Sequence, residues 1–175
     1  MQLETERLRI RPFAPGDEVD AVRFFTDADF MAWSTTGLLS PEDARKRFHG
    51  LIALYHERGF SKMALEEKAG GELVGYCGFG YEPVERHMSP ELGFRLMPQW
   101  QGRGLATEAA RAVVSDAFAR LAMTAILALV VEENLPSRGV LEKLGMQYQR
   151  RTAFYDREVM LYRLERSAFS GAPGG

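Results

Sequence analysis

Hydrophobic and polar positions alternate near the start of the chain and then repeat at helical spacing. Leu8 and Ile10 alternate with arginines, which predicts a strand with one face exposed to solvent. A short helix is expected over 15–27. Ser40, followed by a proline and two acids, is typical of a helix N-terminus, and apolar positions at helical spacing continue to Gly59. This part of the chain therefore predicts one strand followed by two helices.

The middle of the chain predicts three strands and a long helix. Apolar runs over 61–66 and 73–79 are joined by Ala-Gly-Gly, which is typical of a hairpin. A polar stretch over 81–89 is expected to form a loop, and apolar and polar residues alternate over 91–96. A turn that contains two glycines then precedes a long amphipathic helix.

The last third predicts a buried strand, a short helix and a final pair of strands. The continuous apolar run over 124–131 is typical of a central strand that is covered on both faces. A helix over 134–145 follows, and then two strands within 147–164. The complete order predicts an α/β fold with a mixed sheet and helices on both faces. We expect a single domain over 1–166 and a flexible tail over 167–175.

Composition narrows the class of protein. The 175 residues include 22 Lys and Arg against 24 Asp and Glu, a formal charge of −2, which argues against a nucleic-acid-binding protein. The longest apolar stretch, 121–131, is well short of the roughly 20 residues of a membrane helix, and the N-terminus lacks the apolar segment of a signal peptide. Cys77 is the one cysteine, so no internal disulfide forms, and no Cys/His cluster has metal-site spacing. These observations predict a cytoplasmic protein that binds neither nucleic acid nor membrane and acts without a metal.

The most informative segment, 99–106, lies between a predicted strand and the long helix. Gly102 and Gly104 let the backbone turn with its N–H groups pointing outward, and the helix N-terminus adds partial positive charge, which suits a phosphate or pyrophosphate. A tight turn without a ligand would contain the same glycines. No P-loop sequence occurs, and Thr107 stands where a dinucleotide-binding fingerprint has its third glycine.

The spacing of the motifs distinguishes between these interpretations. Residues 99–106 read Gln-x-x-Gly-x-Gly-x-Ala, which resembles the acetyl-CoA signature of the GNAT N-acetyltransferase superfamily. Residues 134–146, an asparagine and a serine followed by Lys-Leu-Gly, are similar to the next motif of that family. Residues 3–11 resemble the subgroup that includes the ribosomal-protein-alanine N-acetyltransferases. The resemblance covers about 3–164 and implies a mixed, mostly antiparallel sheet with acetyl-CoA as cosubstrate.

The resemblance also implies which residues bind the cofactor. Backbone N–H groups of the glycine turn are expected to hold the pyrophosphate, and Arg103 to add a phosphate contact unless its side chain is simply solvated. Main-chain groups of the preceding strand are expected to pair with the pantetheine arm, and Asn134 to lie beside it while it caps the following helix. The cofactor-binding residues implied in this way are Phe94, Leu96, Met97, Gln101, Gly102, Arg103, Gly104, Leu105, Ala106, Asn134 and Ser137.

Acetyl transfer to an amine requires two proton transfers. The amine loses a proton when it attacks the thioester, and the departing thiolate gains one. In many family members a glutamate at the position of Glu91 accepts the proton, usually through water. Glu91 is therefore the expected base, with an exposed strand carboxylate of no catalytic role as the alternative. Glu82, Glu85 and His87 are the competing candidates.

The proton donor is where the sequence departs from the common family pattern. Many members carry a tyrosine at the position of Leu141, which cannot donate a proton. In the ribosomal-protein subgroup a serine near the start of this helix is the favoured donor, and Ser137 occupies that place. Its hydroxyl would equally suit hydrogen bonding to the first turn of the helix. Tyr155 and solvent are the alternatives.

Several other residues have an ordinary structural interpretation. His49 and His56 lie seven apart on one predicted helix without a third ligand, so we expect surface histidines. Cys77 lies in an apolar strand and is expected in the core. Trp33 and Tyr55 either line the acceptor cleft or simply pack.

The expected activity is transfer of an acetyl group from acetyl-CoA to a primary amine. Direct attack in a ternary complex is expected, because no nucleophile with a paired base accompanies the motifs. The expected acceptor is the α-amine of a protein N-terminus or of a small amino compound. Two alternatives stay open: a small-molecule acetyltransferase for an amino acid, a polyamine or an antibiotic, and a non-catalytic acyl-CoA-binding sensor. The sequence leaves the acyl chain and the oligomeric state undetermined, a homodimer included.

Overall fold

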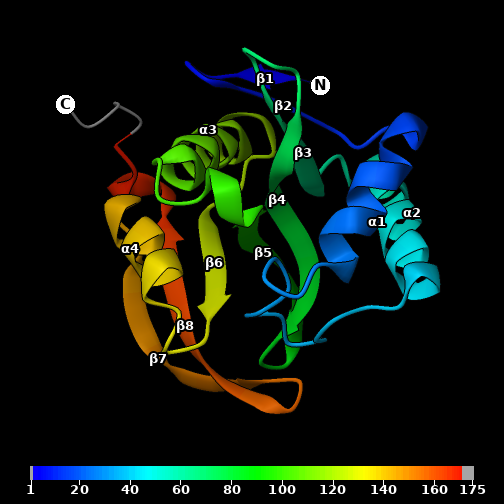
Figure 1. Cartoon of the computed structure of the whole chain (residues 1–175). Coiled ribbons are helices and arrows are strands. Elements are labelled where there is room, and N and C mark those ends of the chain that lie inside the picture. Colours follow the sequence, from blue (N-terminus) through cyan, green and yellow to red (C-terminus); the bar gives the residue numbers. More distant parts are fainter. Residues whose placement is uncertain (1, 171–175) are drawn as a thin grey trace.

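A computed structural model describes residues 2–170 of the chain, which fold around an eight-stranded sheet with helices on both faces (Figure 1). The strands are β1 (Leu3–Glu4), β2 (Leu8–Arg11), β3 (Lys62–Glu67), β4 (Leu73–Val84), β5 (His87–Leu96), β6 (Ala125–Val130), β7 (Gln147–Phe154) and β8 (Arg157–Glu165). The helices are α1 (Glu18–Thr26), α2 (Pro41–Arg58), α3 (Leu105–Arg120) and α4 (Leu135–Lys143). The predicted fold class is confirmed.

The sheet contains one weakly paired junction. Its strand order is β1-β2-β3-β4-β5-β6-β8-β7. β5 and β6 run parallel, whereas the other neighbouring pairs of the described strands are antiparallel. β4 and β5 pair continuously from Gly75 to Val84, but β5 and β6 pair only where Glu91 lies opposite Leu127. The two parallel strands therefore separate after a short contact and leave main-chain groups without a strand partner.

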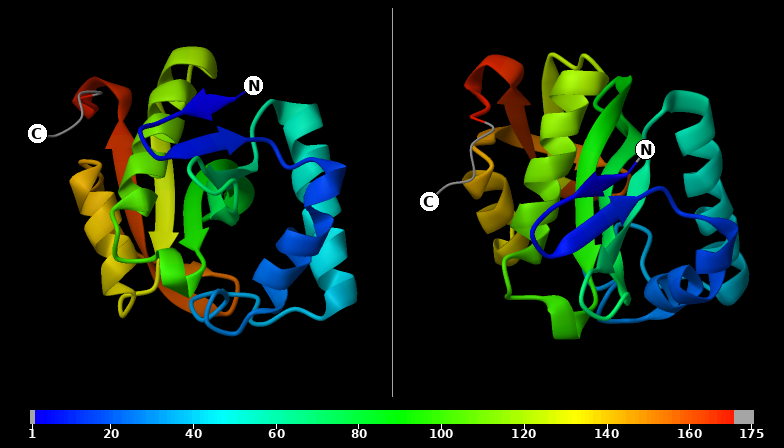
Figure 2. Two further views of the ribbon diagram at one scale, coloured as in Figure 1. Left: turned by 45° about the horizontal axis from the view of Figure 1, so that its top comes forward. Right: turned by 90° about the horizontal axis from the view of Figure 1, so that it is seen from above.

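The two faces of the sheet carry different layers. α1 and α2 lie side by side on one face, and α3 and α4 lie on the other (Figures 1 and 2). The α1–α2 layer is aromatic, because Phe24, Phe25 and Phe48 are fully buried and pack with Tyr76 of β4. On the other face a stripe of alanines and valines from α3 is buried together with Leu141 of α4. Burial of this apolar surface is the main force that holds both layers on the sheet.

The ends of the helices follow their sequence signals. The Ser40 hydroxyl accepts a hydrogen bond from Asp43 N at 3.1 Å and caps α2, which ends at Gly59 with φ of 73°. Asn134 caps α4 with its Oδ1, which accepts from Ser137 N at 3.2 Å. Both caps agree with the predicted starts of these helices.

The segment 81–89 is not the loop that its polarity suggested. β4 continues to Val84 and β5 begins at His87, so the two strands form a long hairpin. The polar side chains of this hairpin contact the β7–β8 hairpin: Arg150 Nε donates to Glu85 Oε1 at 2.8 Å. Polarity here reflects contacts between hairpins and not the absence of a strand.

Three smaller features differ from what the sequence suggested. β6 is not fully covered on both faces: every second side chain from Ile126 is buried, and the others are half-buried. β1 was not predicted, since two residues are too few to show a periodicity. Of the predicted tail, Ser167 and Ala168 belong to a short 3-10 turn and Phe169 packs against Phe118, while 171–175 lie outside the described residues.

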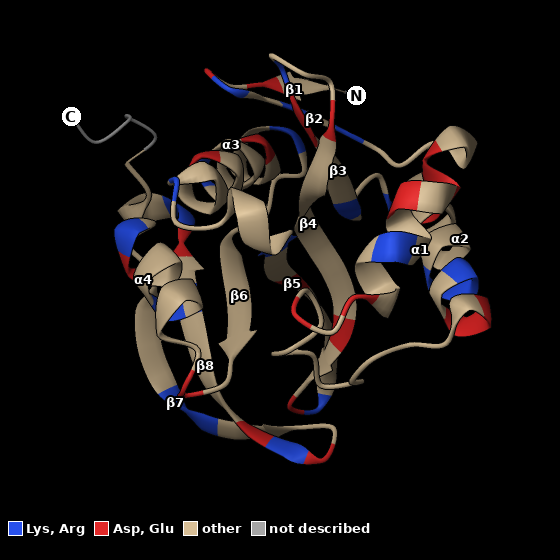
Figure 3. Cartoon of the chain, viewed as in Figure 1, with Lys and Arg blue, Asp and Glu red and all other residues tan. Residues whose placement is uncertain are grey.

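Charged side chains are concentrated on the outer elements. Figure 3 shows both signs of charge on α1, α2 and the β7–β8 hairpin, whereas β6 carries none. Among the described residues, no helix has the length and the apolar character that crossing a membrane requires.

Candidate active site

A cavity of about 870 Å³ lies where β5 and β6 separate. Its lining includes residues 91–96 of β5, 128–130 at the end of β6, and Val131 directly after it. The turn before α3, the first turns of α4, part of α2 and the connection between α1 and α2 also contribute. Segments that are remote in sequence thus meet at one cavity, whose volume is typical of small-molecule sites.

The turn before α3 has the backbone conformation of an anion site. Gly102 and Gly104 have φ of 72° and 77°, values at which a side chain would be strained. Gly104 is the N-cap of α3, and no side chain caps this helix. Since the first backbone bond runs from Glu108 N to Gly104 O at 3.0 Å, the N–H groups of 105–107 have no acceptor within the described chain. Free N–H groups at a helix N-terminus attract anions such as phosphate.

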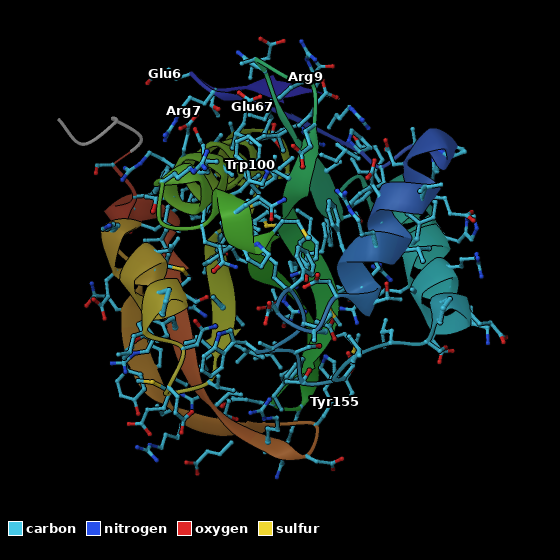
Figure 4. All side chains as sticks on the ribbon, in the orientation of Figure 1. Glu6, Arg7, Arg9, Glu67, Trp100 and Tyr155 are labelled. Atoms are coloured by element: carbon cyan, nitrogen blue, oxygen red, sulfur yellow. The ribbon has the colours of Figure 1, made fainter. Side chains whose placement is uncertain are left out.

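The N-terminal segment holds this turn in place. Arg7 Nη1 donates to Arg103 O at 2.8 Å, and Arg7 Nε donates to Glu108 Oε2 at 2.7 Å. Burial acts to raise the pKa of Glu108, but hydrogen bonds from Thr5 and Arg7 outweigh it and hold that pKa below its usual range. Glu108 is therefore ionised at neutral pH. Figure 4 shows Arg7 beside α3, at the other end of the molecule from Tyr155.

The open edge of β5 offers main-chain groups to a ligand. Met97 N donates to Val74 O of β4 at 2.9 Å. Because an antiparallel strand directs its N–H and C=O groups alternately to either side, Phe94 and Leu96 present theirs on the side away from β4. The Leu96 carbonyl already accepts from Gln101 Nε2 at 2.9 Å. Of the three residues expected along the pantetheine arm, Phe94 and Leu96 line the cavity and Met97 does not.

The start of α4 adds polar groups to the cavity. Asn134 is buried, and its Oδ1 is used in capping the helix. Ser137 is half-buried and lines the cavity, and its hydroxyl has no hydrogen-bond partner among the described residues. Leu141, at the position where the common family pattern has a tyrosine, is buried in the same lining.

Glu91 is buried and paired, which excludes the exposed carboxylate that was one of its two interpretations. Its Oε2 accepts from Lys62 Nζ at 3.0 Å, and its Oε1 accepts from Leu129 N at 3.3 Å. Lys62 is itself only 8% exposed. A Cβ on Gly93 would lie 2.3 Å from Lys62 Nζ, so this glycine provides the space that the lysine occupies. Removing either charge would leave the other buried without a counter-ion.

A second carboxylate, Glu82, lines the same cavity. Its Oε2 accepts from the Tyr155 hydroxyl at 3.2 Å, and its Oε1 accepts no hydrogen bond from the described residues. Burial raises the pKa of Glu82, and the nearby Lys62 offsets this only in part. Burial also raises the pKa of Tyr155, with Glu82 adding to the effect. A carboxylate with a raised pKa is suited to accept a proton close to neutral pH.

Comparison with known proteins identifies the family. A profile described as "Acetyltransferase (GNAT) domain" matches residues 7–147. This chain belongs to the GNAT acetyltransferase family. The uncharacterized N-acetyltransferase YoaA of Bacillus subtilis is 30% identical over 146 residues, which are 83% of this chain and 82% of that protein.

Solved GNAT structures share the fold. An acetyltransferase from Agrobacterium tumefaciens has 27% sequence identity and a TM-score of 0.82, and the match covers 95% of each chain. A ribosomal-protein-S5-alanine acetyltransferase from Vibrio fischeri shares the fold at 18% identity, with a TM-score of 0.78 over 97% of this chain and 99% of that one.

Family membership defines the general reaction. GNAT proteins transfer an acetyl group from acetyl-CoA to an amine, so this protein is an acetyl-CoA-dependent acyltransferase. The residues present fit that cosubstrate, because uncapped N–H groups suit a pyrophosphate and the open edge of β5 suits the amide groups of pantetheine.

Some residues that the sequence suggested for the GNAT site lie elsewhere. Arg103 is exposed and stacks over Trp100, with its Cζ 5.0 Å from the ring centre. Glu85 is paired with Arg150, and His87 is exposed at the start of β5; neither lines the cavity. Glu85 and His87 are therefore removed as candidate bases.

The other residues considered from the sequence also lie partly at the cavity and partly away from it. Trp33 lines the cavity, whereas Tyr55 is not part of its lining. Cys77 is fully buried, and burial raises its pKa to about 12, which agrees with the expected core position. His49 and His56 are both exposed, and the described residues include no group of three His, Cys, Asp or Glu that would hold a metal ion.

Three site residues were not predicted from the sequence: Lys62, Arg47 and Arg95, which all line the cavity. A lysine within an apolar strand was a signal for the first, and glycines inside neighbouring strands were a second signal, since such glycines often mark a close approach. No sequence pattern distinguished the two arginines from surface residues.

Proposed function

We propose that this GNAT protein acetylates the α-amine of a peptide N-terminus or of a small amino compound. One observation carries the proposal: the uncapped turn before α3 and the two carboxylates Glu82 and Glu91 line the same cavity. Acetyl-CoA bound along β5 would bring its thioester to an amine held near these carboxylates. Direct attack is favoured because Cys77, the one cysteine of the chain, is fully buried and its raised pKa keeps it a thiol.

The two carboxylates suit different tasks in this reaction. Both oxygens of Glu91 already accept hydrogen bonds, from Lys62 and Leu129, so its orientation is fixed, and the remaining lone pairs of its carboxylate can accept from an incoming ammonium group. Glu82 has a free oxygen and a raised pKa, which suits proton acceptance. We therefore assign proton acceptance to Glu82 and amine positioning to Glu91, which changes the expectation that Glu91 alone is the base.

Ser137 is the proposed donor to the departing thiolate. It lines the cavity with a hydroxyl that has no partner among the described residues. Tyr155 is less suited, because its hydroxyl already donates to Glu82. Leu141 offers no proton.

Acid–base chemistry favours an α-amine over a lysine side chain as acceptor. An α-amine has a pKa of about 7.7–8.0, so roughly a tenth of it is neutral at pH 7, whereas a lysine with a pKa of about 10.4 is neutral less than about once in a thousand. A site whose base is a single carboxylate suits the acceptor that loses its proton more easily.

A turnover assay with two peptides tests the proposal. One peptide has a free N-terminus and no lysine, and the other has a blocked N-terminus and one internal lysine. We expect release of CoA and an acetyl group only with the first peptide, as mass spectrometry would show. Acetylation of the second peptide alone would contradict the proposed acceptor.

The same assay separates the alternative functions. Turnover of free amino acids, polyamines or antibiotics, with none on peptides, would favour a small-molecule enzyme. Binding of CoA in calorimetry without turnover of any amine would favour a non-catalytic sensor. Cytoplasmic localisation and a homodimer remain predictions, which fractionation of cells and sedimentation would test.

A further inference from the structure

Two arginines in the lining of the cavity have no ion-pair partner. Arg47 of α2 and Arg95 of β5 are both half-buried, and neither forms a salt bridge within the described part of the chain. Arg95 Nη1 lies 3.0 Å from Met31 Sδ, a weak acceptor. Arg47 Nη1 lies 3.5 Å from Thr36 Oγ1, and its Cζ lies 5.4 Å from the centre of the Phe25 ring, a stacking contact that leaves the N–H groups at the edge of the guanidinium free. Partly buried guanidinium groups with such weak partners retain most of their capacity to bind an anion.

Both arginines reach the same connection between α1 and α2. Met31 and Thr36 are joined through Ser34, whose N–H donates to Met31 O at 2.9 Å and whose hydroxyl lies 2.9 Å from Thr36 Oγ1. Two cations of the cavity lining, from different elements, therefore converge on one short segment of the cavity wall, which Arg157 of β8 also contacts from outside the lining, with Nη1 3.3 Å from Ser34 O.

The other lining cations near these arginines are already neutralised. Lys62 is paired with Glu91 at 3.0 Å, and Arg58 with Glu57 at 3.1 Å. Glu82 affects Arg47 only electrostatically, without an ion pair. The cavity thus contains two carboxylates, the ion-paired Glu91 and the unpaired Glu82, and two guanidinium groups that form no ion pair within the described chain, Arg47 and Arg95.

We propose that the amine acceptor carries a carboxylate, which Arg95 and Arg47 bind while the amine lies at Glu82 and Glu91. A guanidinium binds a carboxylate through two parallel hydrogen bonds, which fixes its orientation as well as its distance. This inference rests on the proposed function, because it names the class of acceptor for the same site. The carboxylate is either the α-carboxylate of an amino acid or an acidic side chain close to a peptide N-terminus.

Matched acceptors test the inference and distinguish the two sources. In the first arm, kcat/KM is measured for L-amino acids and for their carboxamides. In the second arm, it is measured for C-terminally amidated tripeptides with Asp or Asn at the second position. Each pair is compared at a pH above the pKa of both amines, so that the neutral fraction of the amine is equal.

The arginine variants supply the second comparison. We expect the acidic acceptor of at least one arm to be preferred, and Arg95→Met to lower its kcat/KM by about 10- to 100-fold. The same variant should leave the neutral acceptor within about twofold. Arg47→Met should act in the same direction. Arg95→Lys keeps the positive charge but cannot form the two parallel hydrogen bonds of a guanidinium, so its kcat/KM for the acidic acceptor should lie between those of the wild type and Arg95→Met.

Arg45→Met is the matched control, because Arg45 lies two residues before Arg47 on α2, outside the cavity, and pairs with Glu18. Calorimetry with CoA checks that each variant is folded and binds the cofactor as the wild type does. Turnover of amides and acids alike, or equal losses for both in Arg95→Met, would overturn the inference and leave the proposed function intact. Failure of every amine to react, with CoA bound, would overturn both.

Discussion

The cavity has two halves that are built from different chemical groups. The half that we propose for the cofactor consists of the turn 101–104 and the first turn of α3, and offers main-chain N–H groups at two glycines with positive φ. The half that we propose for the acceptor consists of the side chains Arg47, Lys62, Glu82, Glu91 and Arg95. The first half depends on the course of the backbone, and the second depends on which side chains stand on it.

This difference predicts how each half responds to change. Main-chain groups are the same in every residue, so the cofactor half is sensitive only to substitutions that alter the backbone or what holds it. In the acceptor half one carboxylate or guanidinium determines the chemistry. Removal of Glu82, Arg47 or Arg95, which form no ion pair within the described chain, should leave the fold in place, whereas removal of Glu91 leaves Lys62 buried without its counter-ion. A fold can therefore keep one cosubstrate while its acceptor differs between relatives.

The largest expected effect lies in the acceptor half, at Glu82. Glu82→Gln should lower kcat by about 10²- to 10³-fold, because a general base contributes on that order. In the wild type, kcat should rise with pH through the pKa of Glu82, which burial places above its ordinary value of about 4.3. The base acts only when deprotonated, so this rise should be absent in the variant. A pH series of kcat at saturating substrates measures it.

Glu91→Gln is the matched change, and it should act mainly on KM for the amine. Its expected loss of amine binding follows from removing the carboxylate that Lys62 and Leu129 hold in place, and thermal unfolding separates this loss from the destabilisation expected when Lys62 loses its counter-ion. If Glu91→Gln abolished kcat while Glu82→Gln kept the wild-type pH profile, the assignment of the two carboxylates would be reversed.

The next largest effect tests the cofactor half. Replacing Gly102 and Gly104 together by valine should weaken CoA binding by about a hundredfold or more, with the protein still folded. Both positions have φ above 70°, where a β-branched side chain is strongly disfavoured, and the turn would change course. Calorimetry measures the dissociation constant, and circular dichroism checks the fold. Unchanged CoA affinity would place the pyrophosphate elsewhere.

The difference between the halves also explains what the sequence could predict. The cofactor half is local: Gly102 and Gly104 follow a strand and precede a helix within a few residues, so the resemblance of this short segment to the GNAT acetyl-CoA signature indicated it. The same holds for α2, because the residue types at Ser40 and Gly59 predicted both ends of this helix. Fold class followed because the order of such local elements leaves few arrangements.

The acceptor half is not local, and the sequence showed it only in part. Lys62 and Glu91 are 29 residues apart and meet through the register of β3, β4 and β5. The hairpin over 81–89 was misjudged because its polar side chains face the β7–β8 hairpin, which no local pattern records. Glu82 became the proposed base only because the structure places that hairpin, and with it Glu82, at the cavity.

A smaller effect is expected at Ser137, where the two halves meet. Ser137→Ala should lower kcat by about 10²-fold with little change in CoA affinity if the hydroxyl protonates the thiolate. Asn134 already caps α4, so loss of the hydroxyl should not cost the helix its cap. Steady-state kinetics and thermal unfolding are the measurements. A normal kcat would exclude Ser137 as the donor.

The smallest effect tests whether the backbone of the cofactor half needs external support. Arg7→Met removes the hydrogen bonds from Arg7 to Arg103 O and to Glu108, while it keeps an aliphatic side chain of similar length. Arg7 is absent from the cavity lining and its recorded side-chain contacts are to Arg103 O and Glu108, so we expect the loss to act through the turn. We expect about tenfold weaker CoA binding and an unchanged kcat at saturating acetyl-CoA. Arg9→Met is the control, because Arg9 lies two residues further on and pairs with Glu66 instead.

The contact between Arg7 and Glu108 also has a pH dependence. Because the pKa of Glu108 is lowered in the folded protein, the stability that this contact adds should be constant at neutral pH and should be lost as the pH falls through that lowered pKa. Equal CoA affinity of Arg7→Met, Arg9→Met and the wild type would mean that the two glycines maintain the turn without help.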